Sequence, residues 1–222
     1  MGHDQLPATG GEFMATTSPP SRPRRKRVTR SPEDRRAALL SGAAEVFREK
    51  GFADSTVAEL AEAGEVAKGT FYLYFDSKDH LLGAMWEEYV DRFLVTTRAL
   101  LDEGGAWWPT LDRLVRALVA HAVENAELHR IVYRSANAKA LDLCRSSNQR
   151  VIDLMAEFIG RGALAGAFRA GDVKLACRML FHGAHGLLDD LISSAEPIDV
   201  EAVAAAVLEL AHRGLGAPEP TA

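Results

Sequence analysis

The sequence is poor in cysteine and has no long apolar run. Its 222 residues include only two cysteines, Cys144 and Cys177, and they do not form a Cys-x-x-Cys pattern. Two such thiols predict neither a disulfide framework nor a structural zinc site, so we interpret them as small buried residues. No stretch approaches the roughly 20 apolar residues of a membrane helix, and no apolar signal segment opens the chain. We therefore expect a cytoplasmic protein without a membrane partner.

Motifs of catalysis are also missing from the sequence. It contains no Gly-x-Ser-x-Gly, no phosphate-binding Gly-x-x-x-x-Gly-Lys-Ser/Thr and no His-Glu-x-x-His. His182, His185 and Asp189 recur at one-turn spacing, which could hold a metal ion from one helix face. Polar residues at a helix interface give the same spacing, and we favour that interpretation. We expect no enzymatic activity, no cofactor and no metal ion.

The net charge of −5 is distributed unevenly along the chain. Residues 1–30 carry six basic and two acidic residues, a balance of +4, which leaves −9 for the remainder. This segment has few large apolar groups, so we expect a disordered basic arm. Such an arm could lie in a DNA minor groove, although a solvated tail has the same composition.

From Ser31 onward the apolar residues recur with helical period, and no alternating segment predicts a strand. Ser31-Pro32 is a typical helix start, Thr56 and Glu59 have the spacing of a capping box, and Asp172 and Asp199 are candidate N-caps. The predicted class is therefore all-α. The predicted helices cover residues 31–50, a short segment from Thr56 to Gly64, and 67–74, 77–103, 109–125, 127–135, 138–165, 172–194 and 199–214.

The two short helices at 56–64 and 67–74 have the form of a helix-turn-helix, whose second helix enters the DNA major groove. Gly69 disfavours a helix, but it permits the close approach of a phosphate. Lys68 and Thr70 flank it with a charge and a hydroxyl near the positive end of the helix. Phe71 and Phe75 lie one turn apart and are predicted to face inward.

The stretch from Gly51 to Ala61 and the run Lys68-Gly69-Thr70-Phe71-Tyr72-Leu73-Tyr74-Phe75-Asp76-Ser77-Lys78 resemble the DNA-binding domain of TetR-type regulators. The resemblance covers about residues 31–85. It implies phosphate contacts from Thr56, Tyr74 and Lys78, and positions in or along the major groove for Lys68, Gly69, Thr70 and Tyr72. It also implies three segments: the arm at 1–30, a three-helix DNA-binding domain at 31–80, and a larger helical ligand-binding and dimerisation domain at 81–222.

The chain departs from the family pattern at two places in the turn. The family usually has Ala-Gly where this chain has Gly64-Glu65, and often has Ser where this chain has Ala67. A left-handed backbone at Glu65 would cost on the order of 1 kcal/mol, and Ala67 removes an N-cap side chain. Both changes affect where the second short helix starts.

The resemblance implies a homodimer on a roughly palindromic operator, in which the helices at 172–194 and 199–214 form a four-helix bundle with their copies. Their apolar faces are supplied by Leu175, Met179, Leu187, Leu191, Val203, Val207 and Leu210.

A repressor of this type would leave DNA when a largely apolar small molecule favours another tilt of the helix at 77–103. Candidate lining residues are Trp86, Phe93, Trp107, Trp108, His121, Tyr133, Met155, Phe158 and His182. Two alternatives remain: a metal-responsive or ligand-independent DNA-binding regulator, and a helical oligomeric enzyme or binding protein.

Overall fold

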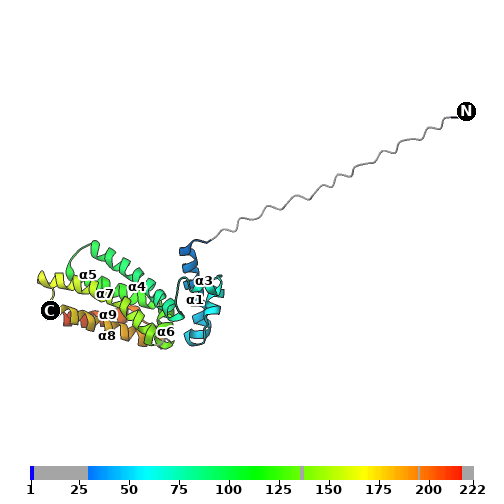
Figure 1. Cartoon of the computed structure of the whole chain (residues 1–222). Coiled ribbons are helices and arrows are strands. Elements are labelled where there is room, and N and C mark those ends of the chain that lie inside the picture. Colours follow the sequence, from blue (N-terminus) through cyan, green and yellow to red (C-terminus); the bar gives the residue numbers. More distant parts are fainter. Residues whose placement is uncertain (3–29, 136–137, 195, 217–222) are drawn as a thin grey trace. The chain divides into compact units, whose positions relative to one another are not determined.

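Helices build the part of the chain that the computed structural model describes, which comprises residues 1–2, 30–135, 138–194 and 196–216 (Figure 1). No strand occurs within these ranges, in agreement with the predicted all-α class. Most of the predicted arm lies outside the described residues. The helices are α1 (Pro32–Asp54), α2 (Val57–Ala63), α3 (Lys68–Phe71), α4 (Lys78–Asp102), α5 (Trp107–Glu124), α6 (Ala126–Ser135), α7 (Ala138–Leu164), α8 (Val173–Ser193) and α9 (Val200–Gly214).

Local capping explains where several helices begin. The Ser31 hydroxyl accepts a hydrogen bond from the amide of Asp34 at 3.0 Å, and the Asp34 carboxylate accepts one from the amide of Ser31 at 3.1 Å. Asp172 and Asp199 cap α8 and α9 as predicted. The first helix was predicted to end at residue 50. The backbone does break at Gly51, where φ is +81°, but a further helical turn follows it.

The first three helices pack around a small aromatic and aliphatic core. Leu39, Phe47, Leu60 and Phe71 are almost completely buried. The end of α2 lies so close to α1 that a Cβ atom at Gly42 would be 2.6 Å from the Ala63 carbonyl carbon. Glycine at this position therefore fixes the distance between the two helices.

The remaining helices form a bundle beside this unit (Figure 1). Helix α4 packs against α5 and α7, α5 against α9, and α7 against α8, while α6 packs against both α1 and α8. One apolar core runs through both parts, from Leu39 in α1 to Leu215 after α9. No helix among the described residues is long and apolar enough to span a bilayer.

Candidate DNA-binding and effector sites

The turn between α2 and α3 contains the residues that depart from the family pattern, Gly64, Glu65 and Ala67. Glu65 has φ of +53°, the left-handed conformation that favours glycine. Gly64 cannot be exchanged for a larger residue freely, because its Cβ would lie 2.9 Å from Leu39 Cδ2. The chain therefore uses its glycine for close packing and places Glu65 in the strained position. Ala67 precedes α3 without a side-chain cap, as predicted.

Helix α3 presents one face to the core and another to solvent. Phe71 and Phe75 are buried, as predicted, whereas Tyr72 is 50% exposed and Leu73 is 81% exposed. Lys68 and Gly69 are exposed, Thr70 and Tyr74 are half-buried, and a Cβ at Gly69 would meet no atom within 4 Å. The outer face is therefore open to a partner.

The helix itself is shorter than the predicted 67–74. After Phe71 the chain tightens, with the amides of Leu73 and Tyr74 bonded to carbonyls three residues earlier. Burial of both Phe71 and Phe75 accompanies this tightening. So short a helix has little dipole, which weakens the predicted attraction of an anion to its start. Leu73 was not among the predicted DNA-binding residues, although its position opposite Phe71 and Phe75 in the sequence pattern places it on the outer face.

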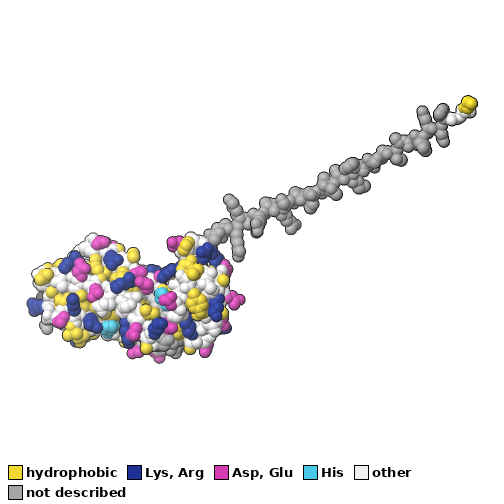
Figure 2. Space-filling model, viewed as in Figure 1, with side chains coloured by type: hydrophobic (Ala, Val, Ile, Leu, Met, Phe, Trp, Pro, Cys, Tyr) yellow, Lys and Arg dark blue, Asp and Glu magenta, His cyan; other side chains and the backbone are white. Residues whose placement is uncertain are grey.

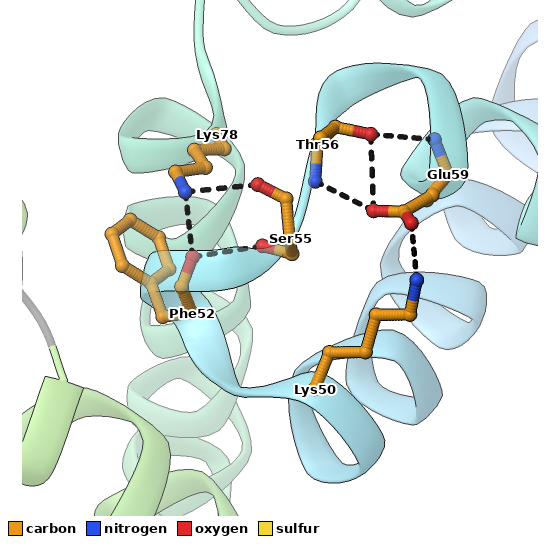
Figure 3. Close-up of polar contacts among 6 residues, drawn as sticks. All are labelled: Lys50, Phe52, Ser55, Thr56, Glu59 and Lys78. Atoms are coloured by element: carbon orange, nitrogen blue, oxygen red, sulfur yellow. Dashed lines mark hydrogen bonds and ion pairs between the residues drawn. The ribbon is translucent and has the colours of Figure 1, made fainter.

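Thr56 and Lys78 are already engaged within the protein (Figure 3). The Thr56 hydroxyl accepts from the Glu59 amide and donates to the Glu59 carboxylate at 3.0 Å. Lys78 Nζ donates to the carbonyl oxygens of Phe52, Ala53 and Ser55 at 2.6, 2.9 and 3.0 Å. These bonds tie the start of α4 to the last turn of α1 and to Ser55, which follows it. A phosphate contact by either residue would share atoms that already have partners.

Charge around the motif is mixed rather than strongly basic. Lys50 forms an ion pair with Glu59, and hydrogen bonds from Lys50 and Thr56 lower the pKa of Glu59 to about 2. Figure 2 shows acidic and basic side chains interspersed over the visible face of the described chain. Uniform positive charge therefore does not explain DNA binding by the described residues.

An apolar chamber of about 50 Å³ lies between α4, α5, α7, α8 and α9. Two of the predicted lining residues, Phe93 and Met155, contact it, together with residues such as Leu114, Phe181 and Ala184. A smaller cavity shares Phe93 and Phe181 with the chamber. A third cavity of about 260 Å³ adjoins the second at His185 and has Arg145 in its wall.

The other predicted lining residues are divided between different places. Tyr133 and His182 line the third cavity, while Trp107 and Trp108 line a separate hollow beside Arg169. Trp86, His121 and Phe158 pack within the helical bundle. Trp86 Nε1 donates to Asn148 Oδ1 at 2.8 Å, and His121 Nε2 lies 3.0 Å from the Tyr89 carbonyl oxygen.

A polar cluster connects three helices beside these cavities. His129 Nδ1 lies 2.7 Å from Asp189 Oδ1, His185 Nδ1 lies 3.0 Å from Asp189 Oδ2, and His129 Nε2 lies 3.0 Å from the Tyr89 hydroxyl. Sequence spacing had grouped His182 with His185 and Asp189, but His182 is exposed and His129 takes its place. Sequence spacing missed His129 because it lies on α6, 56 residues before His185.

Burial controls the protonation of this cluster. It lowers the pKa of His129, although the hydrogen bond to Asp189 opposes that shift. Burial also disfavours the charged form of Asp189, but the hydrogen bonds from His129 and His185 outweigh it and lower the pKa of the carboxyl group. Asp189 is therefore an ionised acceptor held between two imidazole rings.

Comparison with known proteins identifies the family. Residues 39–85 match the family model of bacterial regulatory proteins of the tetR family. The chain is 24% identical over 181 residues to the fatty acid metabolism regulator protein of Bacillus subtilis, covering 80% of this chain and 93% of the relative. It is 24% identical over 157 residues to the HTH-type transcriptional repressor KstR2 of Mycolicibacterium smegmatis, covering 67% and 75% of the two chains.

This chain belongs to the TetR family. It is a DNA-binding transcriptional regulator of the ligand-responsive repressor type. The fold agrees with that of the fatty acid degradation regulator FadR from Bacillus halodurans, with a TM-score of 0.72 and 23% identity over 87% of this chain and 100% of that one. FadR from Bacillus subtilis in complex with stearoyl-CoA gives a TM-score of 0.70 and 22% identity over 80% and 98% of the two chains.

The last two helices of this TetR-type regulator leave apolar side chains in solvent. Leu175, Met179 and Leu187 on α8 are 56%, 68% and 40% exposed, and Leu210 on α9 is 57% exposed. Added Cβ atoms at Gly183 and Gly186 would meet nothing within 4 Å. The predicted contributions of Val203 and Val207 differ, because both are buried in the core of their own chain.

Proposed function

We propose that this repressor is released from its operator by an amphipathic acyl compound of the acyl-CoA type. The observation that carries the proposal is the series of three adjoining cavities, which begins at an apolar chamber and ends beside Arg145. An acyl chain would fill the chamber, and the polar part would extend toward the guanidinium group. The stearoyl-CoA in the complex of a structurally similar FadR has this division between an apolar chain and an anionic end.

DNA would be bound through the outer face of α3. Lys68 would reach a guanine edge, the Thr70 methyl group a thymine methyl, and Gly69 would admit a phosphate close to the backbone. Tyr72 and Tyr74 would direct hydroxyl groups to the phosphates. Thr56 and Lys78 would lie at the edge of this interface. Because both side chains already form hydrogen bonds within the protein, their main role would be to stabilise the motif.

Release would follow from the size of the chamber. A volume of about 50 Å³ is far below the roughly 150 Å³ of a cavity that accommodates one benzene molecule, so the chamber is too small for a long acyl chain. A long acyl chain therefore binds only an arrangement in which the surrounding helices stand further apart. Helix α4 contributes Phe93 to the chamber, and its Lys78 is bonded to the end of α1. A shift of α4 that widens the chamber would therefore move the DNA-binding unit. The ligand would select the released state by this difference in affinity.

A homodimer would present two copies of α3 about 34–36 Å apart, one DNA turn, on a roughly palindromic operator. The exposed apolar residues of α8 and α9 would form its interface. We assign DNA binding to residues 31–80, effector binding and dimerisation to 81–222, and an auxiliary DNA contact to the arm at 1–30. The protein would act in the cytoplasm as a regulator rather than as an enzyme.

The first experiment identifies the operator by sequencing the genomic fragments that the protein retains. Fluorescence anisotropy on that operator then measures release by lauroyl-CoA and stearoyl-CoA, with free coenzyme A as the control. We expect both thioesters to weaken DNA binding and coenzyme A to have no effect. Unchanged operator affinity at saturating thioester would reject the effector class.

Two substitutions separate the DNA site from the effector site. Lys68→Ala should weaken operator binding by about 1–3 kcal/mol. Lys174→Ala removes the same charge from an exposed position on α8 and should weaken it little. Ala184→Leu adds carbon atoms to the chamber wall and should preserve repression while weakening release. A Lys68→Ala protein with full affinity would remove α3 from the proposed interface.

A further inference from the structure

His185 stands at the junction between the apolar and polar parts of the proposed effector site. It lines both the inner cavity, which shares Phe93 and Phe181 with the chamber, and the outer cavity, which contains Arg145. The side chain is buried, with 8% of the residue exposed. Any molecule that extends from the chamber to the outer cavity passes this ring.

The hydrogen bonds of the cluster determine which ring nitrogen of His185 carries a proton. Asp189 is ionised and can only accept, so each imidazole directs an N–H from Nδ1 toward its carboxylate. A neutral imidazole has one N–H, and its other nitrogen is then an acceptor. In His129 that nitrogen accepts a hydrogen bond from the Tyr89 hydroxyl, because burial raises the pKa of Tyr89 and keeps the phenol protonated.

His185 has the same arrangement without the last bond. Its Nε2 atom is buried and has no hydrogen-bond partner among the described residues. The rings of Trp86, Tyr133 and Phe181 lie with centroids 5.8, 5.5 and 5.3 Å from its own. Buried polar atoms are normally paired, and an unpaired acceptor in an aromatic setting is costly. With the proton on Nδ1, Nε2 is an acceptor, and the two cavities that His185 lines give a donor access to it.

We propose that His185 Nε2 accepts a hydrogen bond from an uncharged N–H or O–H group of the effector, at the point where its apolar chain ends. This inference rests on the proposed function, because it assumes that the chain occupies the chamber. Two groups have the required chemistry: an amide N–H beyond the thioester, and a hydroxyl near the carbonyl of the chain. Asp189 acts as a positioning residue that fixes the tautomer of His185.

Such a site discriminates between ligands of equal apolar content. A ligand without a donor would leave the buried nitrogen unpaired, and sites built around a polar group reject analogues that lack it. Its binding should therefore be weaker by about ten-fold or more, the ratio that corresponds to 1.4 kcal/mol. The chain length of the effector, in contrast, would be determined by the chamber.

The test compares three lauroyl compounds with the full-length protein by calorimetry. Methyl laurate has no donor, methyl 3-hydroxylaurate has a hydroxyl, and S-lauroyl-pantetheine has amide N–H groups. We expect at least one donor compound to bind about ten-fold more tightly than methyl laurate, and the stronger of the two identifies the source of the donor. Equal affinity of all three would overturn the inference, whereas failure of all three and of lauroyl-CoA to bind would reject the proposed function itself.

Two variants test whether His185 causes the preference for compounds that carry a donor. His185→Phe keeps an aromatic ring but removes the acceptor, and it should bind every compound as weakly as wild type binds methyl laurate. His80→Phe changes an exposed histidine near the start of α4, outside all three cavities, and should preserve the ten-fold preference. A preference that survives His185→Phe would overturn the assignment.

Two measurements on wild-type protein keep the test independent of folding in the variant. The ¹⁵N chemical shift of His185 Nε2 should move with a donor compound and remain fixed with methyl laurate; the reverse pattern contradicts the inference. Zn²⁺ and Ni²⁺ test the other use of His129, His185 and Asp189, whose donor atoms lie within 4.8 Å of one another. A metal ion that binds through these residues and releases DNA without an organic compound would overturn the inference.

Discussion

At the scale of single residues, the strained turn offers a direct test of the backbone argument. Glu65 adopts φ of +53°, and Glu65→Gly should raise the free energy of unfolding by about 1 kcal/mol because glycine accepts this conformation. Glu62→Gly, an exposed site within α2, should instead lower it by about 1 kcal/mol. Urea titration measures both. Destabilisation by Glu65→Gly would show that the interactions of the glutamate outweigh the strain.

A substitution of Lys78 tests whether this residue stabilises the fold or serves only to contact DNA. Lys78→Met keeps an apolar side chain over the Phe52 ring but removes the donor to three carbonyl oxygens. Hydrogen bonds to charged groups contribute about 1.5–3 kcal/mol, so we expect a loss of stability of about that size. Thermal unfolding without DNA measures it. Unchanged stability with weakened operator binding would assign Lys78 to phosphate contact only.

At the scale of helices, the exposed stripe on α8 tests the dimer. Met179→Glu places a charge in the proposed interface, where an unpaired charge is unfavourable, so it should shift the protein to monomers and reduce operator affinity at least ten-fold. Val95→Glu on α4 is a matched control, because Val95 and Met179 are both 68% exposed. Analytical ultracentrifugation gives the oligomeric state. A dimer that survives Met179→Glu would place the interface elsewhere.

Helix boundaries follow the sequence where their causes are local. Ser31, Thr56, Asp172 and Asp199 cap the helices that they were predicted to cap, because each cap involves residues three positions apart. Helix α3 is shorter than predicted because its end depends on how both phenylalanines fit the core.

Long-range partners were less accessible to sequence reasoning. Only Phe93 and Met155 of the predicted lining residues reach the apolar chamber, since an apolar helix face looks the same whether it meets a cavity or another helix. The pairing of His129 with Asp189 joins residues 60 positions apart, and no local pattern encodes it.

At the scale of the whole molecule, buried histidines couple stability to pH. Burial lowers the pKa of His129 and of His121, so each binds a proton more readily in the unfolded chain. Stability is therefore complete above the ordinary histidine pKa of about 6.5 and falls as the pH drops below it. The lowered pKa of Asp189 affects stability in a separate pH range. Its contribution is complete above the ordinary aspartate pKa of about 3.9 and is lost as the pH falls below that value.

The lowered pKa values of His129 and His121 predict the shape of the pH profile. Between pH 6.5 and 5.5 each such histidine should contribute a slope of up to about 1.4 kcal/mol per pH unit, measured by urea unfolding at fixed ionic strength. His129→Gln removes one titrating group from the buried cluster, so its profile should be flatter than that of wild type over this interval even if its stability at pH 7.5 is lower. A parallel profile would mean that His129 binds the same number of protons in the folded and unfolded states, so that folding does not lower its pKa.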